Sequence, residues 1–449
     1  MSIPSGRLTV GGPARLHGSV AVQGSKNAAQ KLIPAAAAIP GRYRLDNVPE
    51  IEDTEIMLGV LSHLGGKVDR SDRTVVQLDT TALEDREISS ELSRLGTGTF
   101  MFAGALLARF GHARICHPGG DRIGARPVGL HLDAFRALGV TVRELDCAYD
   151  LTATRLRPTT FKFAKRTVNG TVNALLAVVL SGGGTQLQNV AVEPDIENVV
   201  DFLNSAGARL RLDHSSGTLS VKAAAVPIGE ARIAVTPDRN DAATFAVAAS
   251  LAGDTVELVG IGRSDIESLC SLLERVGIRC LASSNGSRPA LVLQRGSLKA
   301  IDDPVESGPY PGLSTDWGPQ IQVLLSQLPA PSEFHETIFS NRFAHVAELS
   351  KMGLDAVLVT PDGTRCPASE FSPHATYTRL KICGPNALVA ARVTANDIRG
   401  GAALVLAGLA ASGTTVVEDS YQVRRGYSRF AERLSGLGAD ISDSVVEPT

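Results

Sequence analysis

The sequence predicts a two-domain α/β protein in which each domain contains three similar α/β units. Three observations carry this prediction. The 449 residues exceed what one ordinary hydrophobic core accommodates. A strand-like segment, a polar turn and an amphipathic helix ending in glycine recur six times along the chain. Each of these copies also follows a helix of small apolar residues.

The amphipathic helices define where each copy ends. In the copies YRLDNVPEIEDTEIMLGVLSHLGGKV and TQLQNVAVEPDIENVVDFLNSAGARL, a glycine separates the helix from a following strand-like segment. A helix that closes in the left-handed backbone conformation favours glycine at that position. The copies are much longer than solenoid repeats of about 20 to 50 residues, so each is a small α/β unit. The closing glycines are Gly65, Gly139, Gly207, Gly277, Gly353 and Gly438.

The helices that precede the copies predict the two cores. Small apolar residues occupy nearly every side of them, so we expect these helices to be buried, three at the centre of each domain. Their segments are KNAAQKLIPAAAAIPG, TFMFAGALLARFG, TVNALLAVVLSGGG, AATFAVAASLAGD, DWGPQIQVLLSQLPA and RGGAALVLAGLAASG.

The N-terminal residues RLTVGG indicate a strand that completes the second domain, so the chain is expected to begin there, cross over and return. The first domain is predicted to span residues 23–234, and the second to combine residues 1–22 with residues 235–449. We expect the active site in the cleft between the two domains.

Composition excludes several classes of protein. The formal charge of -3 gives no bulk attraction to nucleic acid. The six cysteines form no C-x-x-C pair, which favours reduced thiols in the cytoplasm. The N-terminus has no basic segment followed by an apolar core, and the apolar runs are interrupted by glycine, so neither export nor a membrane span is predicted.

No cofactor or metal site is predicted. The run SGGGTQ lacks the Gly-Lys-Ser/Thr ending of a phosphate-binding P-loop. The histidines show no metal-ligand spacing, and His131 and His345 are interpreted as packed helix residues. We expect no metal and no tightly bound cofactor.

The segment PGGDRIGARPVGLH, residues 118–131, has two interpretations. Its glycines allow unusual backbone conformations, and Arg122 and Arg126 offer forked donors, so the loop could close over an anion. The alternative is an ordinary surface turn with solvated charges.

Several phrases, in order over nearly the whole chain, resemble the enolpyruvyl transferases. They are QGSKNAAQKLIPAAAA, PGGDRIGARPVGLH, STDWGPQ, ETIFSNRFAHV, DIRGGAALVLAG and RRGY. The resemblance implies an inside-out α/β barrel of two domains with three repeats each. It also implies a reaction in which an acceptor hydroxyl adds to C2 of phosphoenolpyruvate, C3 is protonated and phosphate is expelled. That chemistry needs cations, a base and an acid in one site.

By resemblance, Lys26 contacts phosphoenolpyruvate and Asn27 contacts the acceptor, at a position where a helix N-terminus already favours anions. The alternative for Lys26 is a solvated side chain. The resemblance makes Arg126, Arg399 and Arg425 ligands of phosphoenolpyruvate, with Arg342 at the edge of the site. Taken singly, an arginine is more often a surface charge.

Three aspartates are the candidates for proton chemistry and its support. By resemblance Asp316 is the base that accepts the proton of the acceptor, and its alternative role is to cap the following helix. Asp397 is expected to orient the arginines or assist proton transfer, again with capping as the alternative. Asp238, in the phrase PDRND, is a weaker supporting candidate.

Asp121 departs from the family pattern, because most members carry cysteine there. That cysteine helps to protonate C3 and is the target of fosfomycin. An aspartate can act as a general acid but cannot form the thioether with the drug. The sequence therefore predicts resistance to fosfomycin.

The acceptor-side phrases of the peptidoglycan branch of the family are also changed. Thr97, in RLGTGTF, occupies or adjoins the position at which that branch has an arginine. Arg94 is a possible substitute for that arginine. The uracil-holding phrase ends at Pro127, Val128 and Gly129, where the last residue lacks the usual carboxylate. The diphosphate-binding phrase becomes TVNGT, which includes Gly170; Ser340 replaces a glutamate, and QVRRGY replaces a phrase with an aspartate.

Loss of several charged hydrogen bonds, each worth about 1.5 to 3 kcal/mol, favours a different acceptor. The favoured function is therefore transfer of the enolpyruvyl group to the 3'-hydroxyl of uridine monophosphate (UMP), as in nucleoside-antibiotic pathways. The alternative is transfer to UDP-N-acetylglucosamine in peptidoglycan synthesis. A third possibility is a catalytically silent nucleotide-binding paralogue, which the retained Lys26, Asp316, Asp397 and arginines disfavour. The sequence does not define an oligomeric state.

Overall fold

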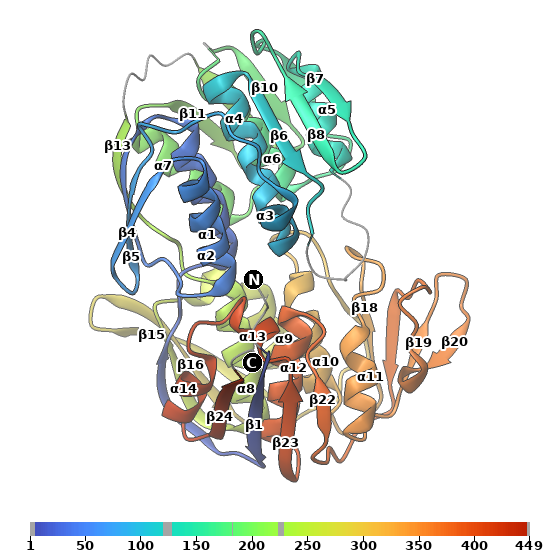
Figure 1. The fold of residues 1–449 in the computed structure, drawn as a ribbon. Coiled ribbons are helices and arrows are strands. Elements are labelled where there is room, and N and C mark those ends of the chain that lie inside the picture. Colours follow the sequence, from blue (N-terminus) through green and yellow to red (C-terminus); the bar gives the residue numbers. More distant parts are fainter. Residues whose placement is uncertain (1–4, 120–127, 182, 223–228, 447–449) are drawn as a thin grey trace. The chain divides into compact units, whose positions relative to one another are not determined.

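The computed structural model describes residues 5–119, 128–181, 183–222 and 229–446, and the chain divides into two compact units. Of the described residues, those from Gln23 to Thr236 form the first unit, and those up to Val22 form the second unit together with those from Pro237 onward. Figure 1 labels the elements of both units along the chain.

The expected boundary between residues 234 and 235 is two residues too early. The backbone N–H of Val235 donates to the carbonyl of Asp46 at 2.8 Å, and the N–H of Ser25 donates to the carbonyl of Thr236 at 2.7 Å. Both hydrogen bonds join residues of the first unit, so Val235 and Thr236 remain part of it.

Three sheets of the first unit lie within the described residues, with strand orders β13-β3-β5-β4, β6-β8-β7 and β11-β12-β10-β9. The helices are α1 (Lys26–Ala38), α2 (Glu52–His63), α3 (Ser90–Leu95), η1 (Thr97–Met101), α4 (Phe102–Phe110), α5 (Gly129–Ala137), α6 (Val168–Val178) and α7 (Pro194–Ser205). The strands are β3 (Gly41–Asp46), β4 (Lys67–Asp72), β5 (Val75–Asp79), β6 (His112–Cys116), β7 (Thr141–Glu144), β8 (Ala148–Thr152), β9 (Thr160–Lys162), β10 (Thr185–Gln188), β11 (Arg209–Asp213), β12 (Thr218–Lys222) and β13 (Gly229–Ala234).

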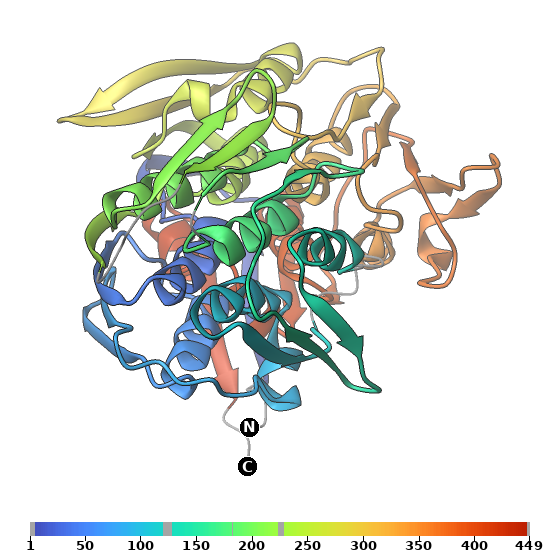
Figure 2. The same ribbon diagram turned by 90° about the horizontal axis from the view of Figure 1, so that it is seen from above.

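The described part of the second unit also contains three sheets, with orders β15-β16-β14-β2, β17-β18-β21-β19-β20 and β22-β23-β1-β24. The helices are α8 (Arg239–Ala252), η2 (Arg263–Ile266), α9 (Glu267–Arg275), η3 (Thr315–Trp317), α10 (Gly318–Leu325), α11 (Ala344–Lys351), η4 (Ala368–Glu370), α12 (Ile398–Ala410), α13 (Tyr421–Arg424) and α14 (Phe430–Gly436). The strands are β1 (Ser5–Gly12), β2 (Leu16–Ala21), β14 (Gly253–Val259), β15 (Ile278–Asn285), β16 (Arg288–Arg295), β17 (Val305–Glu306), β18 (Ser332–His335), β19 (Ala356–Val359), β20 (Arg365–Pro367), β21 (Arg379–Ile382), β22 (Arg392–Thr394), β23 (Gly413–Glu418) and β24 (Asp440–Val446). In both views the long hairpin of β15 and β16, drawn in yellow, projects from its sheet (Figures 1 and 2).

The helices of small apolar residues form the centre of each unit, as the sequence predicts. In the first unit α1, α4 and α6 pack against one another, and in the second α8, α10 and α12 do the same. Nearly every residue of these helices is buried. Alanine and glycine permit this close approach because their side chains occupy little space between helices. Each unit therefore has a separate hydrophobic core.

The glycines that close the amphipathic helices adopt the predicted left-handed conformation. Their φ angles are 93° at Gly65, 88° at Gly139, 100° at Gly207, 98° at Gly277, 95° at Gly353 and 100° at Gly438. A side chain at such a position is strained, so glycine is favoured at each of these turns.

The N-terminal strand completes a sheet of the second unit, as the sequence predicts. Strand β1 pairs antiparallel with β23 on one side and with β24 on the other. Strand β2 then runs parallel to β14 in a neighbouring sheet. The chain therefore contributes two strands to the second unit before it enters the first.

Among the described residues, no helix has both the length and the apolar character that crossing a membrane requires.

Candidate active site

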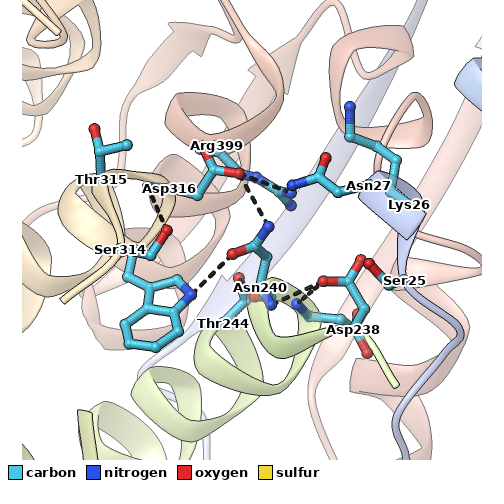
Figure 3. A network of polar contacts seen from close by, with 12 residues as sticks. Ser25, Lys26, Asn27, Asp238, Asn240, Thr244, Ser314, Thr315, Asp316 and Arg399 are labelled. Carbon is cyan, nitrogen blue, oxygen red and sulfur yellow. Dashed lines mark hydrogen bonds and ion pairs between the residues drawn. The ribbon is translucent and has the colours of Figure 1, made fainter. Parts of the chain in front are cut away.

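Asp316 lies in η3, immediately before the buried helix α10. Its Oδ1 accepts a hydrogen bond from Arg342 Nη2 at 2.7 Å. Its Oδ2 accepts from Asn240 Nδ2 at 3.0 Å and from Arg399 Nη2 at 3.4 Å (Figure 3). The cap of η3 is Ser314, whose Oγ accepts from the backbone N–H of Asp316 at 3.2 Å. No described side chain caps the following helix α10, so the alternative role of Asp316 as the cap of that helix is wrong. Its carboxylate instead faces two guanidinium groups.

Arg342 reaches Asp316 from the turn before α11 and is only 5% exposed. Its Nη1 donates to Thr315 Oγ1 at 3.3 Å. Thr315 in turn donates to the buried carboxylate of Glu336 at 2.8 Å, so a chain of hydrogen bonds fixes this guanidinium. The Nε of Arg342 has no hydrogen-bond partner among the described residues.

Arg399 lies in the first turn of α12 and is 2% exposed. Its guanidinium stands 5.2 Å from the ring centre of Tyr427. Burial pushes the pKa of Arg399 down, but Tyr427, Asp316 and Asp238 more than offset this, so the pKa lies above its ordinary value. In the part of the chain that the structure describes, Nη1 of Arg399 is buried without a hydrogen-bond partner. Neither arginine is a surface charge.

Asp397 and Asp238 both cap buried helices. Oδ1 of Asp397 accepts from the backbone N–H groups of Arg399 and Gly400, each at 2.9 Å, and starts α12. Oδ1 of Asp238 accepts from the N–H of Asn240 at 2.8 Å and starts α8. The capping interpretation of Asp397 is thus realised, and through it this carboxylate positions the first turn that carries Arg399.

Arg425 follows α13 and is buried, and its Nη1 donates to Gln422 Oε1 at 3.1 Å. His345 lies in the first turn of α11. Burial, together with the charge of Arg342, lowers the pKa of His345 to about 3, so the ring is neutral. His345 is a packed helix residue, as predicted.

In the first unit, Lys26 begins α1 beneath the cap that Ser25 provides to the N–H of Ala28 at 3.1 Å. Its Nζ lies 2.9 Å from Oδ2 of Asp53, and both residues are buried. The interpretation of Lys26 as a solvated lysine is therefore wrong. Asn27, the next residue, is partly exposed at the same helix end.

The acceptor-side candidates of the first unit lie at three places. Arg94 is exposed in α3, and Thr97 begins η1. Val128 precedes α5, and the position of a Cβ on Gly129 meets open space. Gly170 lies in the first turn of α6, where its N–H donates to Thr167 Oγ1 at 3.1 Å.

Helices α5 and α6 are joined by a buried contact in which Asn173 Nδ2 donates to His131 Nδ1 at 3.0 Å. His131 is thus a packed helix residue, as predicted. Three of the expected site residues, Asp121, Arg126 and Pro127, lie outside the described residues.

Comparison with known proteins identifies the family. The family model of EPSP synthase (3-phosphoshikimate 1-carboxyvinyltransferase) matches residues 10–434. The chain belongs to this family of carboxyvinyl transferases. The resemblance drawn from the sequence motifs is confirmed, and the protein is an enolpyruvyl (carboxyvinyl) transferase.

Two similar relatives are named as UDP-N-acetylglucosamine 1-carboxyvinyltransferases. The UDP-N-acetylglucosamine 1-carboxyvinyltransferase 2 of Carboxydothermus hydrogenoformans is 37% identical over 436 residues, which cover 97% of this chain and 98% of the relative. The UDP-N-acetylglucosamine 1-carboxyvinyltransferase of Anaeromyxobacter dehalogenans is 38% identical over 441 residues, covering 97% and 98%.

Solved carboxyvinyl transferase structures share the fold. The enolpyruvyl transferase NikO from Streptomyces tendae has a TM-score of 0.83 at 24% identity, covering 99% of this chain and 100% of that one. EPSP synthase from Acinetobacter baumannii has a TM-score of 0.72 at 17% identity, covering 98% and 100%. These likenesses confirm the predicted two-domain α/β fold.

The structure of this carboxyvinyl transferase also places residues that sequence reasoning missed. Asp53 contacts Lys26, and Asn240 and Glu336 belong to the hydrogen-bonded network around Asp316. The acidic turn IED of the first copy was the only local signal for Asp53. Asn240 and Glu336 had no such signal, since their roles arise from contacts between distant segments.

Proposed function

We propose that the protein transfers the enolpyruvyl group of phosphoenolpyruvate to a hydroxyl group of a uridine nucleotide, with release of inorganic phosphate. One observation carries this proposal. Arg342 and Arg399 each hold Asp316 with one nitrogen, while Arg342 Nε and Arg399 Nη1 are buried and lack a partner among the described residues. A buried N–H without a partner costs about 1 to 3 kcal/mol, which a bound carboxylate or phosphate would recover.

In the proposed reaction, Asp316 accepts the proton of the acceptor hydroxyl while the hydroxyl oxygen forms a bond to C2 of phosphoenolpyruvate. A proton is added to C3, which gives a tetrahedral intermediate. Loss of a proton from C3 and of phosphate from C2 then restores the double bond, so the products are an enolpyruvyl ether and inorganic phosphate. Asp316 suits the first step because its carboxylate is partly accessible and held in place by three donors.

The remaining roles are proposed from the family resemblance. Asp121 supplies the proton to C3, and Lys26, Arg126 and Arg425 hold the phosphate and carboxylate of the donor. Asp397 orients Arg399 by capping α12.

The acceptor that we favour is the 3'-hydroxyl of UMP. Gly129 contributes no carboxylate to hold uracil, and Thr97 contributes no charge. Arg94, the possible substitute for that missing charge, is exposed in α3. An acceptor with one phosphate and no amino sugar needs fewer of these contacts.

UDP-N-acetylglucosamine is the second candidate acceptor. It is supported by the relatives that are 37% and 38% identical over nearly the whole chain and are named for that substrate. A silent nucleotide-binding paralogue is the least favoured function, because Asp316 is retained and is held by Arg342, Asn240 and Arg399.

The test is a phosphate-release assay with phosphoenolpyruvate and either UMP or UDP-N-acetylglucosamine, with mass spectrometry of the nucleotide product. Turnover with UMP alone supports the favoured acceptor, and turnover with UDP-N-acetylglucosamine alone supports the second. If no uridine nucleotide supports phosphate release, the proposal is contradicted, and turnover only with a different uridine nucleotide would contradict both candidate acceptors. The variant Asp316→Asn serves as the negative control for contaminating phosphatases.

A further inference from the structure

We propose that Asn240 is a positioning residue that holds the Asp316 carboxylate in its productive orientation, and that Trp317 fixes the direction of the Asn240 amide. The inference rests on the proposed function, which assigns Asp316 as the base. The observation that supports it is a contact of three residues within the second unit, in which the Asn240 amide links the Trp317 indole to the Asp316 carboxylate (Figure 3).

Both ends of the Asn240 amide are engaged. Its Oδ1 accepts from Trp317 Nε1 at 2.9 Å, and its Nδ2 donates to Asp316 Oδ2 at 3.0 Å. An indole nitrogen can only donate, so the atom facing it must be the amide oxygen. The NH₂ group is then directed to Asp316, where a carboxylate can only accept. The indole thus selects one of the two amide orientations.

The backbone of Asn240 is also fixed. Its N–H donates to the capping carboxylate of Asp238 at 2.8 Å, and its carbonyl accepts from Thr244 Oγ1 at 2.9 Å. Asn240 is 9% exposed and Trp317 is 1% exposed, so water cannot easily replace either partner. The amide is therefore a rigid support rather than a surface contact.

The charge of the surroundings explains why a neutral donor is useful. Arg342 and Arg399 both pull on the carboxylate, and the same arginines have free N–H groups for an incoming anion. When an anion binds and the guanidinium groups adjust, the Asn240 contact keeps Oδ2 in place. It does so without adding another positive charge beside the base.

Three variants test the inference: Asn240→Leu, Trp317→Phe and the double variant. Asn240→Leu removes the donor, and we expect kcat to fall about 10- to 100-fold with KM for phosphoenolpyruvate changed much less. Trp317→Phe removes the indole N–H together with part of the buried ring and lets the amide turn, so a smaller fall in kcat is expected. Because Trp317 acts through Asn240, the double variant should be no slower than Asn240→Leu.

Asn386→Leu is the matched control. Asn386 is another buried asparagine of the second unit, and its amide contacts only backbone groups of Ser326, Cys383 and Asp355. This variant is expected to lower the melting temperature without changing kcat at a temperature where it is folded. If the losses of kcat in Trp317→Phe and Asn240→Leu multiply in the double variant, the inference is wrong. It is also wrong if folded Asn240→Leu keeps the wild-type kcat.

Crystal structures of Asn240→Leu and Trp317→Phe separate this inference from the proposed function. The Asp316 carboxylate should move away from its wild-type contacts with Arg342 and Arg399 in both. If it stays in place, Asn240 does not position it, whatever the activity. If the wild type releases no phosphate with any nucleotide, the proposed function fails while the crystallographic comparison still decides the positioning.

Discussion

Arg342 Nη2 lies 2.7 Å from Asp316 Oδ1, and this contact joins a carboxylate to a guanidinium that is 26 residues away in the chain. The arginine side chain is almost entirely buried, whereas that of Asp316 is 23% exposed. The carboxylate of the pair is therefore partly accessible, while its cation is buried. This is a suitable arrangement for a base that must remain ionised in a cationic site.

Asp316→Asn should abolish turnover while leaving the donor site formed. An amide cannot accept the proton of an acceptor hydroxyl, so kcat should fall about 100- to 10,000-fold, the usual range for loss of a general base. Its oxygen can still accept from Arg342. We expect equilibrium binding of phosphoenolpyruvate to change less than tenfold. The measurements are phosphate release and isothermal titration; wild-type turnover by the purified variant would exclude Asp316 as the base.

Arg399→Lys should weaken the binding of phosphoenolpyruvate by about tenfold or more, although the positive charge is kept. A lysine offers one ammonium and cannot supply Nη2 to Asp316 and Nη1 to an anion at once. Loss of a charged hydrogen bond costs about 1.5 to 3 kcal/mol. Titration calorimetry with phosphoenolpyruvate measures the effect.

Arg424→Lys is the matched control for that experiment, since Arg424 is a neighbouring arginine that pairs with Asp443 at 3.1 Å. Its binding of phosphoenolpyruvate should equal that of the wild type. Equal affinities of Arg399→Lys and wild type would show that Arg399 does not contact the donor.

The local features of the fold could be predicted from the sequence because they depend on neighbouring residues. Gly65 and Gly438 close helices with φ angles of 93° and 100°, and a helix end of that type favours glycine wherever it occurs. The buried helices could likewise be predicted because each is apolar on nearly every side. The domain boundary was two residues too early, since the backbone contacts of Val235 and Thr236 are not visible in the local sequence.

The candidate site could be predicted residue by residue but not as a network. The family motifs identified Asp316, Arg342 and Arg399 individually. The partner Asn240 is 76 residues from Asp316, and the contact exists only because α8 and η3 pack together in the second unit. Asp53 was missed for the same reason, since its contact with Lys26 joins α2 to α1.

Fosfomycin should not inactivate this enzyme. A carboxylate at Asp121 cannot form the thioether by which the drug blocks members with cysteine there. Incubation with fosfomycin should leave the protein mass unchanged and phosphate release undiminished. The variant Asp121→Cys provides the positive control, because it should gain a covalent adduct and lose activity with time. A mass increase on Asp121 of the wild type would contradict the prediction.

His131 should make the first unit sensitive to acid. Burial lowers the pKa of this ring to about 4, from an ordinary value near 6.5. The unfolded chain therefore binds the proton first, and stability is lost as the pH falls from about 6.5 to about 4. The loss approaches about 3 kcal/mol at the lower end. His131→Gln places a side-chain amide beside Asn173 and should flatten that part of the plot of stability against pH, measured by urea unfolding from pH 7 to pH 4.

The exposed His214 supplies the control, since His214→Gln should leave the slope of stability against pH unchanged. An equal slope in His131→Gln and wild type would show that another group causes the acid sensitivity.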